Sequence, residues 1–176
     1  MPPTLETPRL RLRPYRVTDF EFYAALFSET PVMRFLGGKP LSREVCWTRL
    51  IRHIGMWPAM GFGYFVLECK QTGALVGQAG FQELKRDIAP HIDGTLEAGW
   101  AITGARQGEG LAGEAMRAAL SWADAERPEL RATCIIDPEN APSLRLAAKL
   151  GFAAFSRTHY QGNPIVVMEL ERPPSR

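Results

Sequence analysis

The chain has 176 residues, a length typical of one domain with a substantial buried core. Hydrophobic residues make up 45% of the sequence and charged residues 23%, as in ordinary globular proteins. The 21 basic and 19 acidic residues nearly balance, which argues against a nucleic-acid partner. A local excess of basic residues lies in Met1–Met60, with nine Lys/Arg against five Asp/Glu. It indicates either a solvated surface or a weak attraction for an acidic substrate or polyanionic cofactor.

The three cysteines lie far apart and show no metal-ligand spacing, so we expect reduced thiols, no disulfide framework and no metal site. Reduced thiols favour a cytoplasmic location. No segment has the apolar length of a membrane span, and the first residues lack the apolar core of a secretory signal. The sequence therefore predicts a protein with no membrane partner.

Two periodicities in the first half of the chain predict a strand, two helices and a hairpin. Alternating leucines and arginines in Arg9–Tyr15 indicate a half-buried strand. Apolar residues at helical spacing in Asp19–Glu29 and Ser42–Trp57 indicate helices, each with a capping residue near its start. Gly63–Glu68 and Ala74–Leu84 are strand-like and are joined by a turn, so they predict a hairpin.

The second half alternates strands and helices. Thr95–Thr103, Ala132–Asp137 and Gly162–Arg172 are expected strands. Leu111–Glu126 is an expected helix, and Pro138–Phe152 contains a loop and a short helix closed by a glycine. The order of elements predicts a mixed α/β fold with one sheet.

Three glycines follow the strand Thr95–Thr103 with the spacing G-x-G-x-x-G, at Gly108, Gly110 and Gly113. A dinucleotide-binding loop needs an acidic residue at the end of the next strand, but Glu129 lies before that strand, and too few residues follow for a doubly wound sheet. Backbone N–H groups in such a loop, at the start of a helix, still suit a diphosphate. A glycine turn without a ligand is the alternative.

The loop also resembles a known family motif. The run QGEGLA at residues 107–112 is similar to the acyl-CoA diphosphate motif Q/R-x-x-G-x-G/A of the GNAT superfamily of N-acetyltransferases. Gly113 is then a small helical residue. RLRLRPYRVTDF (residues 9–20), LEAGWAIT (96–103) and DPENAPSLRLAAKLGF (137–152) resemble segments of the ribosomal-protein alanine N-acetyltransferase branch, in the same order.

This resemblance implies a single N-acetyltransferase domain over residues 1–176. Its sheet would be twisted, mostly antiparallel, of about six or seven strands, splayed at the acetyl-CoA site and flanked by about four helices. Acetyl-CoA would be the co-substrate, and the acceptor a primary amine of a protein N-terminus or a small molecule, acetylated by direct transfer. A homodimer fits the resemblance. A non-catalytic acyl-CoA-binding or sensing domain is the alternative. Met33–Leu41 and Trp57–Tyr64 would shape the acceptor site.

The resemblance also implies which residues hold the cofactor. Backbone N–H groups of the glycine loop would face the diphosphate, the preceding strand would pair with the pantetheine arm like an added strand, and an asparagine would bond to that arm. These residues are Trp100, Ala101, Ile102, Gln107, Gly108, Gly110, Leu111, Ala112 and Asn140.

Two residues are candidates for the chemistry. Glu97 is the carboxylate of the strand before the loop and is the candidate base, directly or through water; an exposed edge-strand glutamate is the alternative. Ser143 is the candidate acid or hydrogen-bond donor to the leaving thiolate, and the alternative is a helix cap. His53 is expected at the surface or in the core, and the alternative is that it lines a substrate pocket. Cys134 fits a buried strand residue better than a nucleophile.

Overall fold

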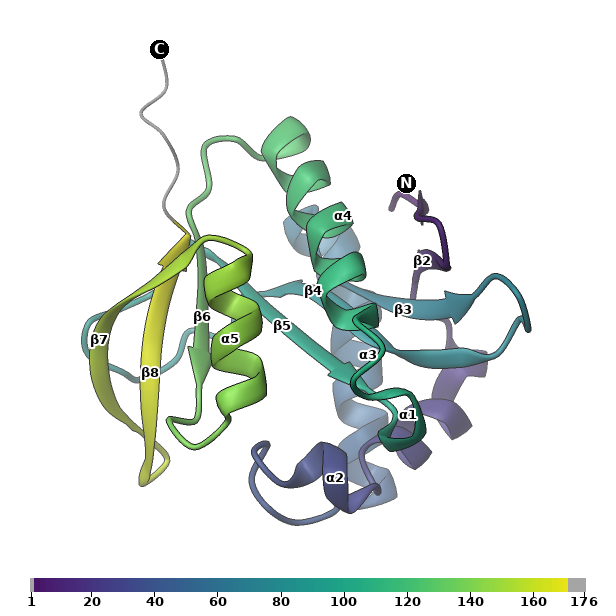
Figure 1. The fold of residues 1–176 in the computed structure, drawn as a ribbon, viewed down its shortest axis with the longest axis horizontal. Helices are drawn as coiled ribbons and strands as arrows, with labels where there is room; N and C mark the ends of the chain where they lie inside the picture. Colours follow the sequence, from purple (N-terminus) through teal and green to yellow (C-terminus); the bar gives the residue numbers. More distant parts are fainter. Residues whose placement is uncertain (1, 171–176) are drawn as a thin grey trace. The chain divides into compact units, whose positions relative to one another are not determined.

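The computed structural model describes residues 2–170 and has a mixed α/β architecture, as predicted (Figure 1). These residues form one eight-stranded sheet in the order β1-β2-β3-β4-β5-β6-β8-β7. The pairing of β5 with β6 is parallel, and the other pairs whose register is defined are antiparallel. The strands are β1 (Leu5–Glu6), β2 (Leu10–Pro14), β3 (Tyr64–Cys69), β4 (Leu75–Gln82), β5 (Leu96–Ile102), β6 (Ala132–Ile136), β7 (Phe152–Tyr160) and β8 (Asn163–Leu170). The α-helices are α1 (Phe20–Leu26), α2 (Thr30–Met33), α3 (Arg43–Met60), α4 (Leu111–Glu126) and α5 (Ala141–Lys149).

The chain divides into two compact units. The first consists of Met1–Gln82 and Gly99–Trp122, and the second of Glu83–Ala98 and Ala123–Arg176. Strand β5 therefore contributes its first three residues to the second unit and its last four to the first. A single domain over residues 1–176 stays a prediction, as does the splay of the sheet.

The first unit is built on the alternation predicted from the sequence. Leu10 and Leu12 of β2 are fully buried, whereas the arginines between and beside them are more accessible. In β3, Tyr64 joins the buried cluster formed with α1 and α3, and its neighbour Phe65 packs edge-on against Trp122 of α4. Figure 1 accordingly shows α3 behind the strands of this unit and α4 in front of them.

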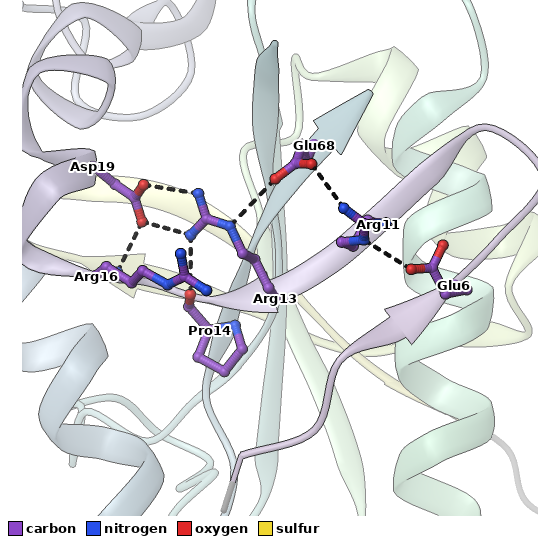
Figure 2. Close-up of polar contacts among 7 residues, drawn as sticks. All are labelled: Glu6, Arg11, Arg13, Pro14, Arg16, Asp19 and Glu68. Carbon is purple, nitrogen blue, oxygen red and sulfur yellow. Dashed lines mark hydrogen bonds and ion pairs between the residues drawn. The ribbon is translucent and has the colours of Figure 1, made fainter. Parts of the chain in front are cut away.

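Part of the basic excess near the start of the chain forms a network with carboxylates (Figure 2). Arg13 donates two hydrogen bonds to the buried Asp19, at 2.8 and 2.9 Å, and also pairs with Glu68 at 3.4 Å. Arg11 lies between Glu6 and Glu68, at 2.8 and 3.1 Å. Arg11 and Arg13 therefore have acidic partners within the fold, and the attraction of the basic excess for an acidic substrate or polyanionic cofactor stays a prediction.

The second unit is a smaller layer of strands with one helix. Strand β6 pairs with β8, and β8 pairs with β7, both antiparallel. Helix α5 packs against β6 and β7. A core cluster joins the loop before β5 to β8 and contains Ile88, Ile92, Ile165 and Val167.

Three elements were not predicted. Strand β7 is largely exposed and mixes small, polar and aromatic residues, so its sequence lacks a clear apolar alternation. Strand β1 has two residues and α2 has four, too few for a periodic signal. The last expected strand appears as β8, and its final two expected residues, 171 and 172, lie outside the described residues. No helix in the described range has the length and apolar character needed to cross a bilayer.

Candidate functional site

The glycine loop adopts a backbone that favours glycine. Gly108 and Gly110 have φ angles of 82° and 78°, in the left-handed region. A side chain at Gly108 would meet no atom within 4 Å, and both residues are exposed. The first bond of α4 runs from the Glu114 amide to the Gly110 carbonyl at 3.1 Å. Because the first amides of a helix have no acceptor within it, the loop presents N–H groups at the positive end of a 16-residue helix.

Side chains within the loop hold its shape. Arg106 donates to both carboxylate oxygens of Glu109, at 2.7 and 2.8 Å, and this lowers the pKa of Glu109. The Gln107 side chain donates to the Ile102 carbonyl at 3.1 Å, and its backbone amide bonds to the Gly104 carbonyl at 3.4 Å. Gln107 thus braces the loop against the end of β5, and its predicted contact with the cofactor stays a prediction.

The segment before β2 fastens the other end of the loop. Arg9 donates to the Glu109 carbonyl at 2.9 Å and to the Glu114 carboxylate at 2.7 Å. The Thr7 hydroxyl donates to the same carboxylate at 2.6 Å. Burial raises the pKa of Glu114, but the hydrogen bonds from Thr7 and Arg9 outweigh it and hold that pKa below its usual value. The loop is therefore preorganised by residues about a hundred positions away in the sequence.

The strand before the loop is packed closely in the first unit. Trp100 is half-buried, and Ala101 and Ile102 are buried. A side chain at Gly77 of β4 would overlap the Ala101 carbonyl, so β4 and this part of β5 approach closely. Just beyond β5, the Gly104 amide donates to the Glu29 carboxylate at 2.6 Å. The bond connects the start of the loop to the residue before α2.

Glu97 is buried rather than exposed at an edge. It is 4% exposed, and Arg86 donates to both of its oxygens at 2.7 Å. The Arg86 guanidinium also lies over the Tyr160 ring, 4.5 Å from its centre. Both carboxylate oxygens of Glu97 therefore accept from the guanidinium. The surface alternative for Glu97 is therefore wrong, and its role as a base stays a prediction.

Cys134 of β6 is 1% exposed, as expected for a buried strand residue. Burial raises the pKa of its thiol to about 12, and the nearby Glu97 charge adds to this effect. A thiol with this pKa is protonated at neutral pH and is a poor nucleophile. The prediction that Cys134 is structural is confirmed.

Asn140 and Ser143 lie together in the first turn of α5. Asn140 is the N-cap, and its side-chain oxygen accepts from the Ser143 amide at 3.2 Å. The cap of this helix is therefore supplied by Asn140. The predicted contacts of Asn140 with the pantetheine arm and of Ser143 with the thiolate remain predictions.

His53 belongs to the core and not to the surface, as one of the expected alternatives had it. It is 3% exposed, and its Nε2 lies 3.1 Å from the Tyr23 hydroxyl. Burial lowers the pKa of His53 to about 3, with smaller contributions from Arg52 and Arg49. The ring is thus neutral at physiological pH, packed among tyrosines.

Sequence reasoning missed the charged residues that brace the candidate site. Their partners are mostly remote in the sequence, and the sequence around an arginine carries no signal of which distant carboxylate or carbonyl it meets. Only the Arg106–Glu109 pair has a local spacing, i and i+3, that indicates a contact. The missed residues are Arg9, Glu29, Arg86, Arg106, Glu109 and Glu114.

These features suit a diphosphate-containing thioester. Exposed glycines at a helix start leave room for phosphate oxygens, and Leu111, 2% exposed, anchors the helix start in the core. Within residues 2–170, no group of three or more His, Cys, Asp or Glu is arranged to hold a metal ion. A mixed sheet with a glycine loop between a strand and a long helix places the chain in the class of α/β acyltransferases that the motif resembles.

Comparisons with known proteins support the assignment to the acyltransferases. A model of the acetyltransferase (GNAT) domain matches residues 9–153, so the chain belongs to the GNAT family and is an N-acetyltransferase. The YkkB protein of Bacillus subtilis strain 168 is 31% identical over 171 residues, 94% of each chain. A Bordetella pertussis structure assigned to the GnaT family has 35% identity and a TM-score of 0.86, covering 96% of this chain and 99% of that one. An Agrobacterium tumefaciens acetyltransferase has 26% identity and a TM-score of 0.81, with 97% and 95% covered.

More distant structures share the fold. The ribosomal-protein acetyltransferase RimL in complex with coenzyme A has 14% identity and a TM-score of 0.75, covering 95% of this chain and 97% of that one. The spermidine N-acetyltransferase of Vibrio cholerae, in complex with coenzyme A and spermine, has 19% identity and a TM-score of 0.71, with 93% and 96% covered. The fold is thus shared with enzymes that acetylate different amines.

Proposed function

We propose that the protein transfers the acetyl group of acetyl-CoA directly to a primary amine of a protein N-terminus or a small molecule. The observation that carries the proposal is the braced glycine loop at the start of α4, with Gly108 and Gly110 in left-handed conformations. Its exposed position and its match to the family motif support a diphosphate as the occupant.

In this proposal, amides of Gly108, Gly110, Leu111 and Ala112 bind the diphosphate. Gln107 adds a bracing contact from its side chain to the end of β5. The segment Trp100–Ile102 pairs with the pantetheine arm, and Asn140 donates to the same arm through its amide N–H, while its oxygen caps α5. Acetyl-CoA supplies an activated thioester, and these contacts orient it.

Glu97 and Ser143 carry the proton transfers in this proposal. As the amine nitrogen bonds to the acetyl carbon and the carbon–sulfur bond breaks, Glu97 accepts the proton of the amine, directly or through a water. Arg86 holds that carboxylate in one orientation, which supports a fixed direction of approach for the amine. The Ser143 hydroxyl donates to the departing thiolate.

The acceptor is a primary amine whose class is left to experiment. Two fold relatives are named for different acceptors, a ribosomal protein and spermidine, so both peptide and polyamine acceptors are consistent with this fold. The segments Met33–Leu41 and Trp57–Tyr64 are proposed to select between them. A homodimer and a cytoplasmic location are part of the same proposal.

A thiol-release assay tests the proposal. Purified protein is mixed with acetyl-CoA and a panel of peptides with free N-termini, polyamines, amino acids and aminoglycosides, and free coenzyme A is measured with a thiol reagent. We expect release that depends on one class of amine and a product heavier by one acetyl group. Tight acetyl-CoA binding without release by any amine would favour the sensing domain instead.

A further inference from the structure

Tyr64, the first residue of β3, contacts β5 directly, in addition to ending the segment Trp57–Tyr64 that is proposed to shape the acceptor site. The residue is 5% exposed. A Cβ added at Gly99 of β5 would overlap the Tyr64 hydroxyl oxygen and would lie 3.1 Å from its ring carbon Cζ. The end of the tyrosine thus occupies the space that a side chain at position 99 would need. The φ angle of Gly99 is not in the left-handed region. Glycine is therefore needed at this position because of the limited space, and not because of the backbone conformation.

The surroundings of Tyr64 fix where its hydroxyl lies. The indole of Trp57 in α3 donates to the Tyr64 carbonyl at 3.1 Å, and the same indole fills the space beside Gly63. The His53 ring packs edge-on against the Tyr64 ring at 4.8 Å between centres. In the hairpin, Tyr64 is paired with Gly80 of β4. Backbone and ring are therefore both held, and the hydroxyl is aimed at β5.

Gly99 lies in β5 between the proposed base and the segment proposed to bind the pantetheine arm. It lies two residues after the proposed base Glu97 and directly before Trp100, where the proposed pantetheine-binding segment begins. Resting on the proposed function, we propose that Tyr64 is a positioning residue for acetyl transfer. Its hydroxyl fixes the β5 backbone at Gly99 and so sets the segment that holds the cofactor arm. Small misplacements of a bound reactant lower the rate of a chemical step steeply.

The substitution Tyr64→Phe tests this role. Losing the hydroxyl loosens β5 beside the arm but leaves the glycine loop untouched. We expect kcat to fall about tenfold while the KM for acetyl-CoA changes by less than about twofold. Tyr15→Phe is the matched control, because Tyr15 is 3% exposed in the same cluster and donates to Gln78 at 2.9 Å. This control should lower the melting temperature similarly and retain wild-type kcat. Equal kcat for both variants and the wild type would overturn the proposal.

A double-mutant cycle locates the effect at the contact. Gly99→Ala forces its new methyl group into the hydroxyl, so it should reduce kcat strongly when Tyr64 is present. In the Tyr64→Phe background the oxygen is absent, and only a tight ring contact remains. We expect Gly99→Ala to cost at least about fivefold less in kcat there, because contacting residues couple. Independent effects of the two substitutions would overturn the proposal.

The result remains distinguishable from failure of the proposed function. If none of the amines tested causes the wild-type protein to release coenzyme A, the proposed function fails. The four proteins of the cycle are then compared by their free energies of unfolding in urea. A smaller loss for Gly99→Ala in the Tyr64→Phe background would support the contact that defines the positioning role, and additive losses would overturn it.

Discussion

Glu97 is buried and paired with Arg86, so its carboxylate could serve the fold, the proposed proton transfer, or both. A substitution has to distinguish these two roles. Glu97→Gln keeps the shape of the side chain but removes the charge that holds Arg86. If the carboxylate is the base, kcat should fall by about a hundredfold or more, the usual scale of general-base catalysis. Breaking the buried pair should also lower the free energy of unfolding by about 3 kcal/mol.

Glu169→Gln is the matched control for this prediction. Glu169 accepts two hydrogen bonds from Arg131 in the same unit, at 2.9 and 3.0 Å, and has no proposed role in the chemistry. Its substitution should leave kcat unchanged. A Glu97→Gln protein that melts earlier but turns over normally would identify Glu97 as a structural partner of Arg86.

Gly110 allows a test of the loop at a single position. Gly110→Ala places an L-residue at a φ angle of 78°, which costs about 1–2 kcal/mol and shifts the loop. We expect the KM for acetyl-CoA to rise about tenfold or more, since each lost 1.4 kcal/mol of binding is tenfold. Steady-state kinetics with acetyl-CoA as the varied substrate measures it.

Gly162→Ala carries the same strain at φ 80°, in the turn between β7 and β8, and provides the comparison. It should cost stability and leave the KM for acetyl-CoA as in the wild type. If both alanine variants bind acetyl-CoA equally well, the glycine loop is not the diphosphate site.

His53 makes stability depend on pH. Burial lowers its pKa in the folded protein to about 3, whereas an unfolded histidine titrates near 6.5. Between these values the unfolded chain binds one more proton than the folded protein. The contribution of His53 to the free energy of unfolding is therefore complete above about pH 6.5. It is lost as the pH falls toward 3, by about 1.4 kcal/mol per pH unit.

His53→Phe removes this titration. Urea unfolding at several pH values from 4.5 to 7 should give a free energy of unfolding that falls less steeply with acid in the variant than in the wild type. Parallel curves would show that His53 is charged or accessible in the folded protein.

At the scale of elements, the first turn of α5 combines a structural and a proposed binding task in one side chain. Asn140 caps the helix through its oxygen, and its amide N–H is the proposed donor to the cofactor arm. Asn140→Ala should lower the free energy of unfolding by about 1 kcal/mol and raise the KM for acetyl-CoA. Asn140→Asp keeps the acceptor oxygen, so it should restore the stability while the KM stays high. Recovery of both properties in the aspartate variant would leave Asn140 as a cap alone.

The elements also show what periodicity predicts. The hairpin β3–β4, the long helices α3 and α4, and strand β5 were all expected from the pattern of their apolar residues, most of which are buried. The capping side chain of α3 was predictable as well, since Ser42 accepts from the Val45 amide at 3.3 Å. Strand β7 was not, because its exposed residues receive their strand conformation from pairing with β8.

At the scale of the whole molecule, the sequence supported the fold class and the glycine loop but not the contacts that stabilise them. The loop was recognisable because its residues are contiguous. The partners Arg9 and Glu114 are 105 positions apart, and Arg86 meets Glu97 across a loop. Which arginine pairs with which carboxylate depends on how the elements pack, and this packing cannot be predicted from the local sequence.

The bonds from Thr7 and Arg9 to Glu114 and to the Glu109 carbonyl tie the proposed cofactor loop to the segment before β2. A substitution at Arg9 would therefore weaken acetyl-CoA binding without removing any group that is proposed to touch the cofactor.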